Sequence, residues 1–396
     1  YGDKSESEIA ADNMEEFALY QKVKKDFEKR IADTQENYNY YSKLKNYLAY
    51  ADGEAKAKLG KEEYTLADLN TLDEADRDPI LMQVYSTGGT ASMLMDDADY
   101  RIEHYGPLLK THYNLDFNGR MTDDNAYDIN DVPYGNGFVS GGLGDESHGT
   151  HVAGISLAKR NNGKGSNGVT NNAKLLAVRA VPNGDEYDKD VALGIRYAVD
   201  NGAKVINMSF GKSYSPNPEW VYDAIKYAAS KDVLLVHAAG NDHKDIDKSD
   251  NFPTDAPDKV NEIADNVITV GAMTRNYNED LVAAFSNYGK LNVDIFAPGL
   301  DVYSSIPSNE YKRYPGTSMA APAVAGVAAM VRSYYPELSA SQVKHILMNS
   351  GIKVDKQVKL PGSEDKLVPF SDLSVSGRVL NAYNALKMAD AMVNGK

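Results

Sequence analysis

Residues 233–239 read VLLVHAA, a short apolar run followed at once by the turn pair Gly240-Asn241. A run of this length, bounded by turn formers, is typical of a strand that is buried on both faces of a parallel sheet. Four further runs share this apolar, β-branched character, and helical patterns separate most of them. They are LLAVRAV (175–181), KVINMS (204–209), NVITVGA (266–272) and VDIFAPG (293–299).

The segments between and after these runs show the three- and four-residue apolar spacing of amphipathic helices. These segments are 188–201, 217–231, 317–334 and 339–349. Strands that alternate with helices predict an α/β fold, and right-handed crossovers then produce a doubly wound parallel sheet. The tail from Ser376 predicts a turn and a closing helix.

The first 100 residues differ in composition from the rest. They hold 12 Lys and Arg against 22 Asp and Glu, and only five of the 31 glycines. Apolar residues recur at helical spacing from Phe17 to Leu48, which predicts one helix of more than thirty residues, and a weaker helical pattern fills 65–98. The tyrosine-rich stripe of the first helix is either a partner-binding face or a face packed on the same chain. Packing is the more frequent role of such a stripe.

Composition excludes several classes of protein. The chain of 396 residues has no apolar run near the ~20 residues that a membrane-spanning helix needs. Its net charge of −15 opposes binding to nucleic acid or anionic lipid. Because there is no cysteine, thiol nucleophiles, thiolate metal sites and disulfides are excluded, and a nucleophile would be a hydroxyl, carboxylate or amine.

Two short motifs carry groups that take part in acyl transfer. HGTHVAGI (148–155) places His148 at the start of a small-residue helical segment, where an imidazole can act as a general base, while His151 is interpreted as structural. GTSMAAPAVAG (316–326) places Ser318 at the positive end of an alanine-rich helix, which favours a developing oxyanion. Each residue also has a purely structural interpretation. His148 could be a packed or capping histidine, and Ser318 could be the N-cap of its helix.

Two other motifs end predicted strands. AAGN (238–241) puts the Asn241 amide at the carboxyl edge of the sheet, where doubly wound sheets bind ligands, and NMSFG (207–211) ends the preceding strand. An amide there can donate to a carbonyl oxygen that becomes negative. Turn formation alone also explains a Gly-Asn pair after a strand.

The ordered set HGTHVAG, NMSFG, AAGN and GTSMAAP resembles the subtilisin-like serine proteases, the subtilase family. The resemblance covers about residues 143–350. It extends to AFSNYG from Ala284 and DIFAPG from Asp294. It implies the subtilisin type of doubly wound α/β fold and a serine endopeptidase that hydrolyses peptide bonds through a Ser-His-Asp triad and an acyl-enzyme.

The resemblance also implies roles for particular residues. Ser318 would be the nucleophile, His148 would accept and return its proton, and Asn241 with the Ser318 backbone N–H would bind the oxyanion. The residues implied to bind an extended polypeptide substrate are Ser209, Phe210, Gly211, Ala239 and Gly240. No cofactor is expected for the chemistry. The resemblance is also compatible with structural calcium, which many subtilases bind, and no site is assigned.

The family's aspartate motif, of the type V-I-D-T/S-G, is absent between Tyr1 and His148. The first interpretation is that the acid and its strand lie upstream of Tyr1. Residues 1–140 would then be a mainly helical insertion between the Asp and His motifs, and residues 141–396 the catalytic domain. The start at Tyr1 rather than Met fits the removal of an upstream segment, and a cleaved N-terminal fragment is then a candidate partner.

Two other interpretations of the missing acid stay open. One is an in-chain substitute. The candidates are Asp145, close to His148, and Asp124, Asp128 and Asp131 in the run TDDNAYDINDV (122–132). Asp145 is more simply a helix cap, and the acidic run a solvated loop, because its spacing does not fit the EF-hand template for calcium. The other is a catalytically silent module that uses the scaffold for binding or as a chaperone. The resemblance alone implies an extracytoplasmic location, whether secreted, periplasmic or at the cell surface.

Overall fold

The computed structural model describes residues 1–2, 4–139 and 146–395. The chain forms two compact units, Tyr1–Met121 and Thr122–Lys396. The described part of 122–140, grouped above with the helical region, belongs to the second unit. No helix in the described part of the chain has the length and the apolar character that crossing a membrane requires.

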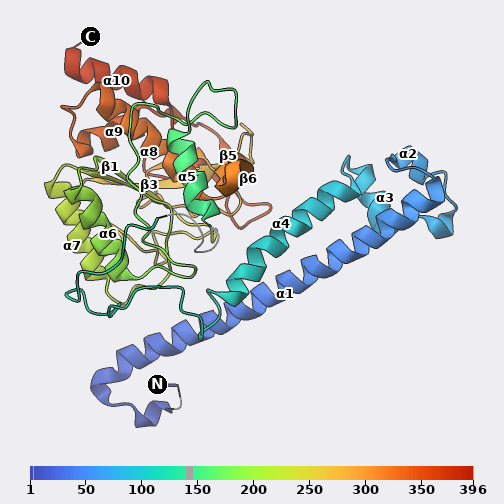
Figure 1. Ribbon diagram of the computed structural model, residues 1–396, viewed down its shortest axis with the longest axis horizontal. Coiled ribbons are helices and arrows are strands. Elements are labelled where there is room, and N and C mark those ends of the chain that lie inside the picture. Colours follow the sequence, from blue (N-terminus) through green and yellow to red (C-terminus); the bar gives the residue numbers. More distant parts are fainter. Residues whose placement is uncertain (3, 140–145, 396) are drawn as a thin grey trace. The chain divides into compact units, whose positions relative to one another are not determined.

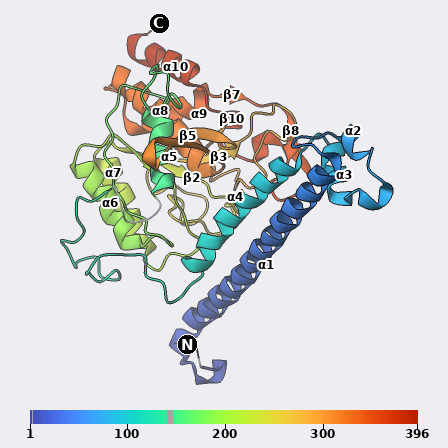
Figure 2. The ribbon, with the colours of Figure 1, turned by 45° about the vertical axis from the view of Figure 1, so that its right-hand side comes forward.

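The first unit is helical, as predicted. Its α-helices are α1 (Met14–Leu59), α2 (Leu66–Leu69), α3 (Pro79–Ser86) and α4 (Ala91–Lys110), with short 3-10 turns at Glu6–Glu8, Ala11–Asn13 and Glu74–Asp76. The long helix α1 confirms the prediction from the apolar stripe, and α4 runs beside it in both views (Figures 1 and 2). Helix α1 ends where Gly60 adopts a φ of +62°, a left-handed conformation that glycine takes without strain.

The aromatic stripe of α1 packs on the same chain. Tyr41 stacks on Tyr105 of α4 with ring centroids 6.2 Å apart, and Phe27 meets Tyr113 edge-on at 6.0 Å. The second predicted helix, over 65–98, is wrong as a single element. The segment is broken because Pro79 begins α3 and Gly88 then takes a φ of +82°, so that α4 begins as a separate helix.

A six-stranded sheet forms the centre of the second unit. The strands lie in the order β1-β2-β3-β4-β10-β7, and all adjacent pairs are parallel except the last, between β10 and β7. Their bounds are β1 (Val205–Met208), β2 (Leu234–Ala238), β3 (Val267–Met273), β4 (Ile295–Pro298), β7 (Ile352–Lys353) and β10 (Arg378–Val379). The strands predicted from 204, 233, 266 and 293 are therefore confirmed.

Helices cover both faces of this sheet (Figure 1). One face carries α6 (Asp188–Asp200) and α7 (Pro218–Ser230), and the other carries α8 (Thr317–Tyr334), α9 (Ala340–Ser350) and α10 (Ala382–Asn394). Alternate residues of β2 divide between the two cores, since Leu235 packs with the α6 and α7 side while Leu234 and Val236 pack with α8 and α9. The doubly wound α/β fold and the closing helix are as predicted.

The remaining elements flank the sheet. They are α5 (Ser147–Leu157), the hairpin of β5 (Val302–Ile306) and β6 (Glu310–Tyr314), the hairpin of β8 (Gln357–Lys359) and β9 (Leu367–Pro369), and 3-10 turns at Pro307–Asn309 and Phe370–Asp372.

The strand predicted from LLAVRAV is wrong. In the structure this segment has no strand conformation, and Leu175, Leu176 and Val178 are 61%, 40% and 38% exposed. A strand needs a neighbour that accepts its backbone hydrogen bonds, and no described strand pairs with this segment. As a result β1 is one of the two edge strands of the sheet among the described residues.

Candidate active site

Ser318 lies in the first turn of α8, a helix whose small side chains allow it to run buried beneath the sheet. Its hydroxyl donates to the backbone carbonyl of Ser209 at 3.3 Å, and the Ser209 hydroxyl donates back to the carbonyl of Ser318 at 2.8 Å. Asn207 supports this link, since its Nδ2 donates to Ser209 Oγ at 2.9 Å. The segment that follows β1 is therefore joined to the positive end of α8.

The side-chain amide of Asn241 has a defined orientation beside this helix start. Its Oδ1 accepts from the backbone N–H of Thr317 at 2.8 Å and from the Thr317 hydroxyl at 3.0 Å. Because both partners are donors, the other amide atom is the nitrogen. Nδ2 makes no hydrogen bond within the described chain, so it can donate to an oxygen atom held at the end of α8.

The AAGN turn is fitted tightly against the same threonine. Gly240 adopts a φ of +99°, which disfavours any residue with a side chain, and its N–H donates to Thr317 Oγ1 at 3.0 Å. Thr317 itself is fully buried. The Thr317 side chain joins the end of β2 to the start of α8. The Asn241 amide and the Ser318 hydroxyl are therefore carried on segments that one buried side chain connects.

The segment Ser209–Gly211 is anchored to the sheet through a buried histidine of β2. The carbonyl of Phe210 accepts from Nε2 of His237 at 2.9 Å. Burial lowers the pKa of His237 to about 4, so its imidazole is neutral at physiological pH and Nε2 carries the donated proton. The Phe210 side chain packs with the apolar cluster of α6 and α7.

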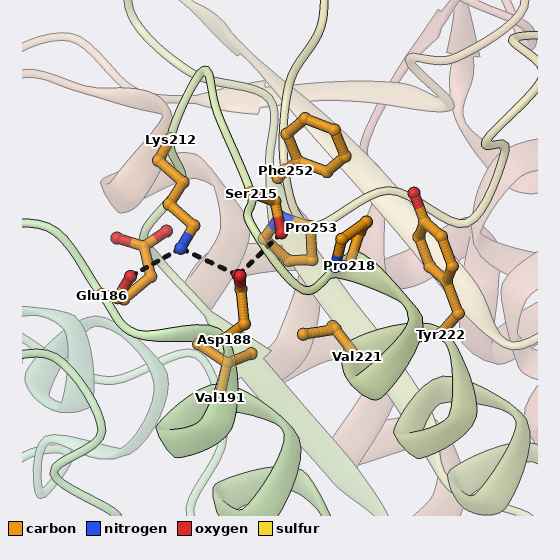
Figure 3. Close-up of a pocket in the computed structure, with 10 residues that line it drawn as sticks. All are labelled: Glu186, Asp188, Val191, Lys212, Ser215, Pro218, Val221, Tyr222, Phe252 and Pro253. Carbon is orange, nitrogen blue, oxygen red and sulfur yellow. Dashed lines mark hydrogen bonds and ion pairs between the residues drawn. The ribbon is translucent and has the colours of Figure 1, made fainter. Parts of the chain in front are cut away.

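A small charged pocket adjoins this segment (Figure 3). Lys212 Nζ donates to the backbone carbonyl of Glu186 at 2.7 Å and pairs with Asp188 Oδ1 at 2.8 Å, and Ser215 donates to the same carboxylate oxygen. The Glu186 carboxyl is buried, and its Oε1 has no hydrogen-bond partner among the described residues. Burial raises the pKa of Glu186 to about 7.

His148 occupies the first turn of α5, where it is exposed. Helix α5 contacts α8, because the Ser156 hydroxyl donates to the carbonyl of Pro322 at 2.8 Å. The second histidine of the motif is structural, as predicted. His151 is fully buried, its Nε2 lies 3.0 Å from the carbonyl of Lys312, and its ring packs on another aromatic ring. The structure thus places the motifs that contain His148 and Ser318 on helices in contact.

Of the candidate acids within the chain, Asp124 has a different partner in the structure. Asp145 lies outside the described residues. The solvated loop predicted for the acidic run 122–132 is wrong at Asp124, whose carboxylate pairs with the fully buried Lys189 at 2.5 Å. The Lys189 ammonium also contacts the carbonyls of Asn125 and Asp131. These three oxygens are therefore occupied by the lysine ammonium. No group of three or more His, Asp or Glu residues in the described chain is placed to hold a metal ion.

Several residues that organise this site escaped the sequence analysis. Thr317 stands next to Ser318 in its motif, and His237 interrupts an otherwise apolar strand. A polar residue within a buried run is the one sequence signal that points to His237, because buried polar groups require partners.

Comparison with known proteins places these features in context. The family profile described as "Subtilase family" matches residues 79–375. The thermophilic serine proteinase of Bacillus sp. (strain AK1) is 40% identical over 227 residues, which is 56% of this chain and 49% of that protein. Thermitase of Thermoactinomyces vulgaris is 38% identical over 241 residues, 61% of this chain and 75% of that protein. The cell wall-associated protease of Bacillus subtilis (strain 168) is 37% identical over 237 residues, 59% of this chain and 24% of that protein. The chain thus spans about half of the first relative and a quarter of the last.

Proposed function

Because this chain belongs to the subtilase family, we propose that it is a serine endopeptidase that cleaves polypeptides through an acyl-enzyme on Ser318. The observation that most supports this is the position of the Asn241 amide at the start of α8, where it bonds to Thr317, the residue before Ser318. Thr317 holds the oxygen of that amide, and the nitrogen remains available to a substrate oxygen.

In the proposed reaction, Ser318 Oγ attacks the scissile carbonyl carbon while His148 takes the hydroxyl proton. Asn241 Nδ2 and the backbone N–H of Ser318 donate to the oxygen that becomes negative. His148 then gives its proton to the leaving amine, which breaks the C–N bond and leaves the acyl ester. A water molecule then attacks the ester carbon while His148 takes its proton. The ester C–O bond breaks, the product acid leaves, and His148 returns the proton to Ser318 Oγ. The chemistry uses only protein groups.

We assign substrate binding to the two segments beside Ser318. Ser209 and Gly211 offer backbone groups to an extended peptide, which would pair with them as an added strand, and Phe210 anchors that segment in the core. Ala239 and Gly240 form the opposite wall. The anchored carbonyl of Phe210 supports this assignment, because it fixes the position of the segment beside Ser318.

We place the triad acid on a strand that is not among residues 1–396. Two features support this: the outer edge of β1 has no neighbour among the described strands, and the apolar residues Leu175 and Leu176 are exposed. An added strand would pair with such an edge. A cleaved N-terminal fragment of the same protein that remains bound would be one form of that partner.

We also place the protein outside the cytoplasm. The support is a relative, the cell wall-associated protease of Bacillus subtilis, together with the family itself.

The test is labelling of the native protein with a fluorophosphonate, followed by mass spectrometry of every chain present. The expected result is one adduct on Ser318, loss of labelling and peptide hydrolysis in Ser318→Ala, and full activity in Ser333→Ala. Ser333 is a matched control because it is an exposed serine of the same helix. Labelling of Ser318→Ala at the wild-type rate would contradict the assignment, and an unreactive wild type would favour a silent binding module.

A further inference from the structure

Asn287 is a buried side chain in the connection between β3 and β4, and it lies against the turn that carries Asn241. It is 1% exposed. Its Nδ2 donates to the carbonyl of Ala239 at 2.8 Å, and its backbone N–H donates to the carbonyl of Gly240 at 2.9 Å. Both acceptors precede Asn241 in the chain.

The same side chain also holds the residues that follow Asn241. Its Oδ1 accepts from the backbone N–H of Asp242 at 3.0 Å and of Lys244 at 2.8 Å. One buried amide therefore uses both of its polar atoms on the turn, with contacts on either side of Asn241. These contacts define the path of the backbone through that residue.

The fit at this turn leaves no space for adjustment. A Cβ on Gly240 would lie 2.4 Å from Asn287 Nδ2, closer than atoms can approach. Because Thr317 fixes only the oxygen of the Asn241 amide, the position of Nδ2 depends on the backbone that Asn287 holds. A misplacement of about 1 Å at such a donor is enough to cost a large factor in rate.

We propose that Asn287 is a positioning residue of the oxyanion site: its four hydrogen bonds to residues 239–244 set the place from which Asn241 donates. This inference rests on the proposed function, since it assigns Asn287 a role through Asn241. If Asn287 merely stabilised the fold, the effect of its removal on the rate would not depend on the presence of Asn241.

The test is a double-mutant cycle on the rate of Ser318 acylation, with Asn287→Ala, Asn241→Ala and the double variant. Asn241→Ala is expected to slow acylation by about 10²–10³-fold, as loss of an oxyanion donor does. Asn287→Ala is expected to slow it at least about 10-fold with little change in KM. In the Asn241→Ala background it should have almost no further effect, because the group it positions is gone.

Asn292→Ala is the matched control. Asn292 is another partly buried amide five residues on, and its Nδ2 donates to Asp247 and to the carbonyl of Lys259, away from the turn. The Asn292→Ala variant should lose a similar amount of folding stability as Asn287→Ala but keep the wild-type rate of acylation. If Asn287→Ala does not fold, Asn287→Asp serves, because it keeps both acceptor contacts and replaces the donation to Ala239 by an oxygen that faces the same carbonyl. An equal loss of rate with and without Asn241, or no loss at all, overturns the proposal. A wild type that is not acylated, or an Asn241→Ala variant that keeps its rate, contradicts the proposed function instead.

Discussion

Replacement of Lys189 by methionine should destabilise the second unit strongly. The Lys189 side chain is 0% exposed and that of Asp124 is 4% exposed. All three protons of the ammonium are used, by the Asp124 carboxylate at 2.5 Å and by the carbonyls of Asn125 and Asp131 at 2.9 and 2.8 Å. The ring centroid of Tyr134 lies 4.5 Å from Nζ. Lys189→Met keeps the length of the side chain but removes the cation that faces the buried Asp124 carboxylate.

The expected size of the effect follows from that burial. Breaking a buried ion pair on one side costs about 3–5 kcal/mol, because the remaining charge is desolvated and unpaired. In a unit of this size, a loss of that magnitude lowers the unfolding midpoint by roughly 6–20 °C. Equilibrium denaturation of wild type and variant measures the free energy of unfolding, and a thermal scan measures the midpoint.

Two further variants separate the ion pair from other effects. Lys189→Met combined with Asp124→Asn removes both charges and should recover much of the loss. Lys248→Met is the control, because the Lys248–Asp245 pair is as short, at 2.6 Å, but its lysine is 82% exposed, and it should change stability by less than about 1 kcal/mol. A Lys189→Met protein within 1 kcal/mol of wild type would refute the reasoning.

Two other predictions concern the neighbourhood of the substrate segment. The Glu186 carboxyl has a pKa of about 7 in the folded protein against ~4.3 when unfolded, so its contribution to stability is complete below pH ~4.3 and is lost as the pH rises through 7. Glu186→Gln should therefore match wild type at pH 4 and exceed it by up to roughly 3 kcal/mol at pH 8, and parallel pH profiles of the unfolding free energy would contradict this. His237→Leu removes the donor to the Phe210 carbonyl and should raise KM about 5-fold, corresponding to ~1 kcal/mol, with kcat nearly unchanged. His237→Gln, which keeps a donor, should restore KM, and a loss confined to kcat would count against the anchoring role.

Much of the fold was predictable because its signals are local. The apolar runs from 233, 266 and 293 form strands that are buried on both faces, and the run from 204 forms a partly buried edge strand. Residue type along each run is enough to predict such a strand. The run from 175 carries the same signal and forms no strand, since strand pairing also depends on a neighbour elsewhere in the chain. The weak pattern over 65–98 failed for another reason, because Pro79 and Gly88 interrupt it.

The site was predictable where a reactive group stands in a short motif. Ser318, Asn241 and Ser209 were all named from sequence, and the structure brings them together. Their supports were not predictable. Thr317, His237 and Asn287 act through hydrogen bonds to residues at distant positions in the chain, so nothing in their own neighbourhoods identifies the partner.

By itself, the sequence determined the class of fold, the family and the groups available for chemistry, because residue type and local spacing specify these. The tertiary structure alone decided which amide atom of Asn241 faces the site, that Asp124 serves a buried lysine, and that Asn287 holds the turn at Asn241. Each of these depends on contacts of at least 40 residues' separation. Burial makes such contacts strong, and only the folded chain defines what is buried together.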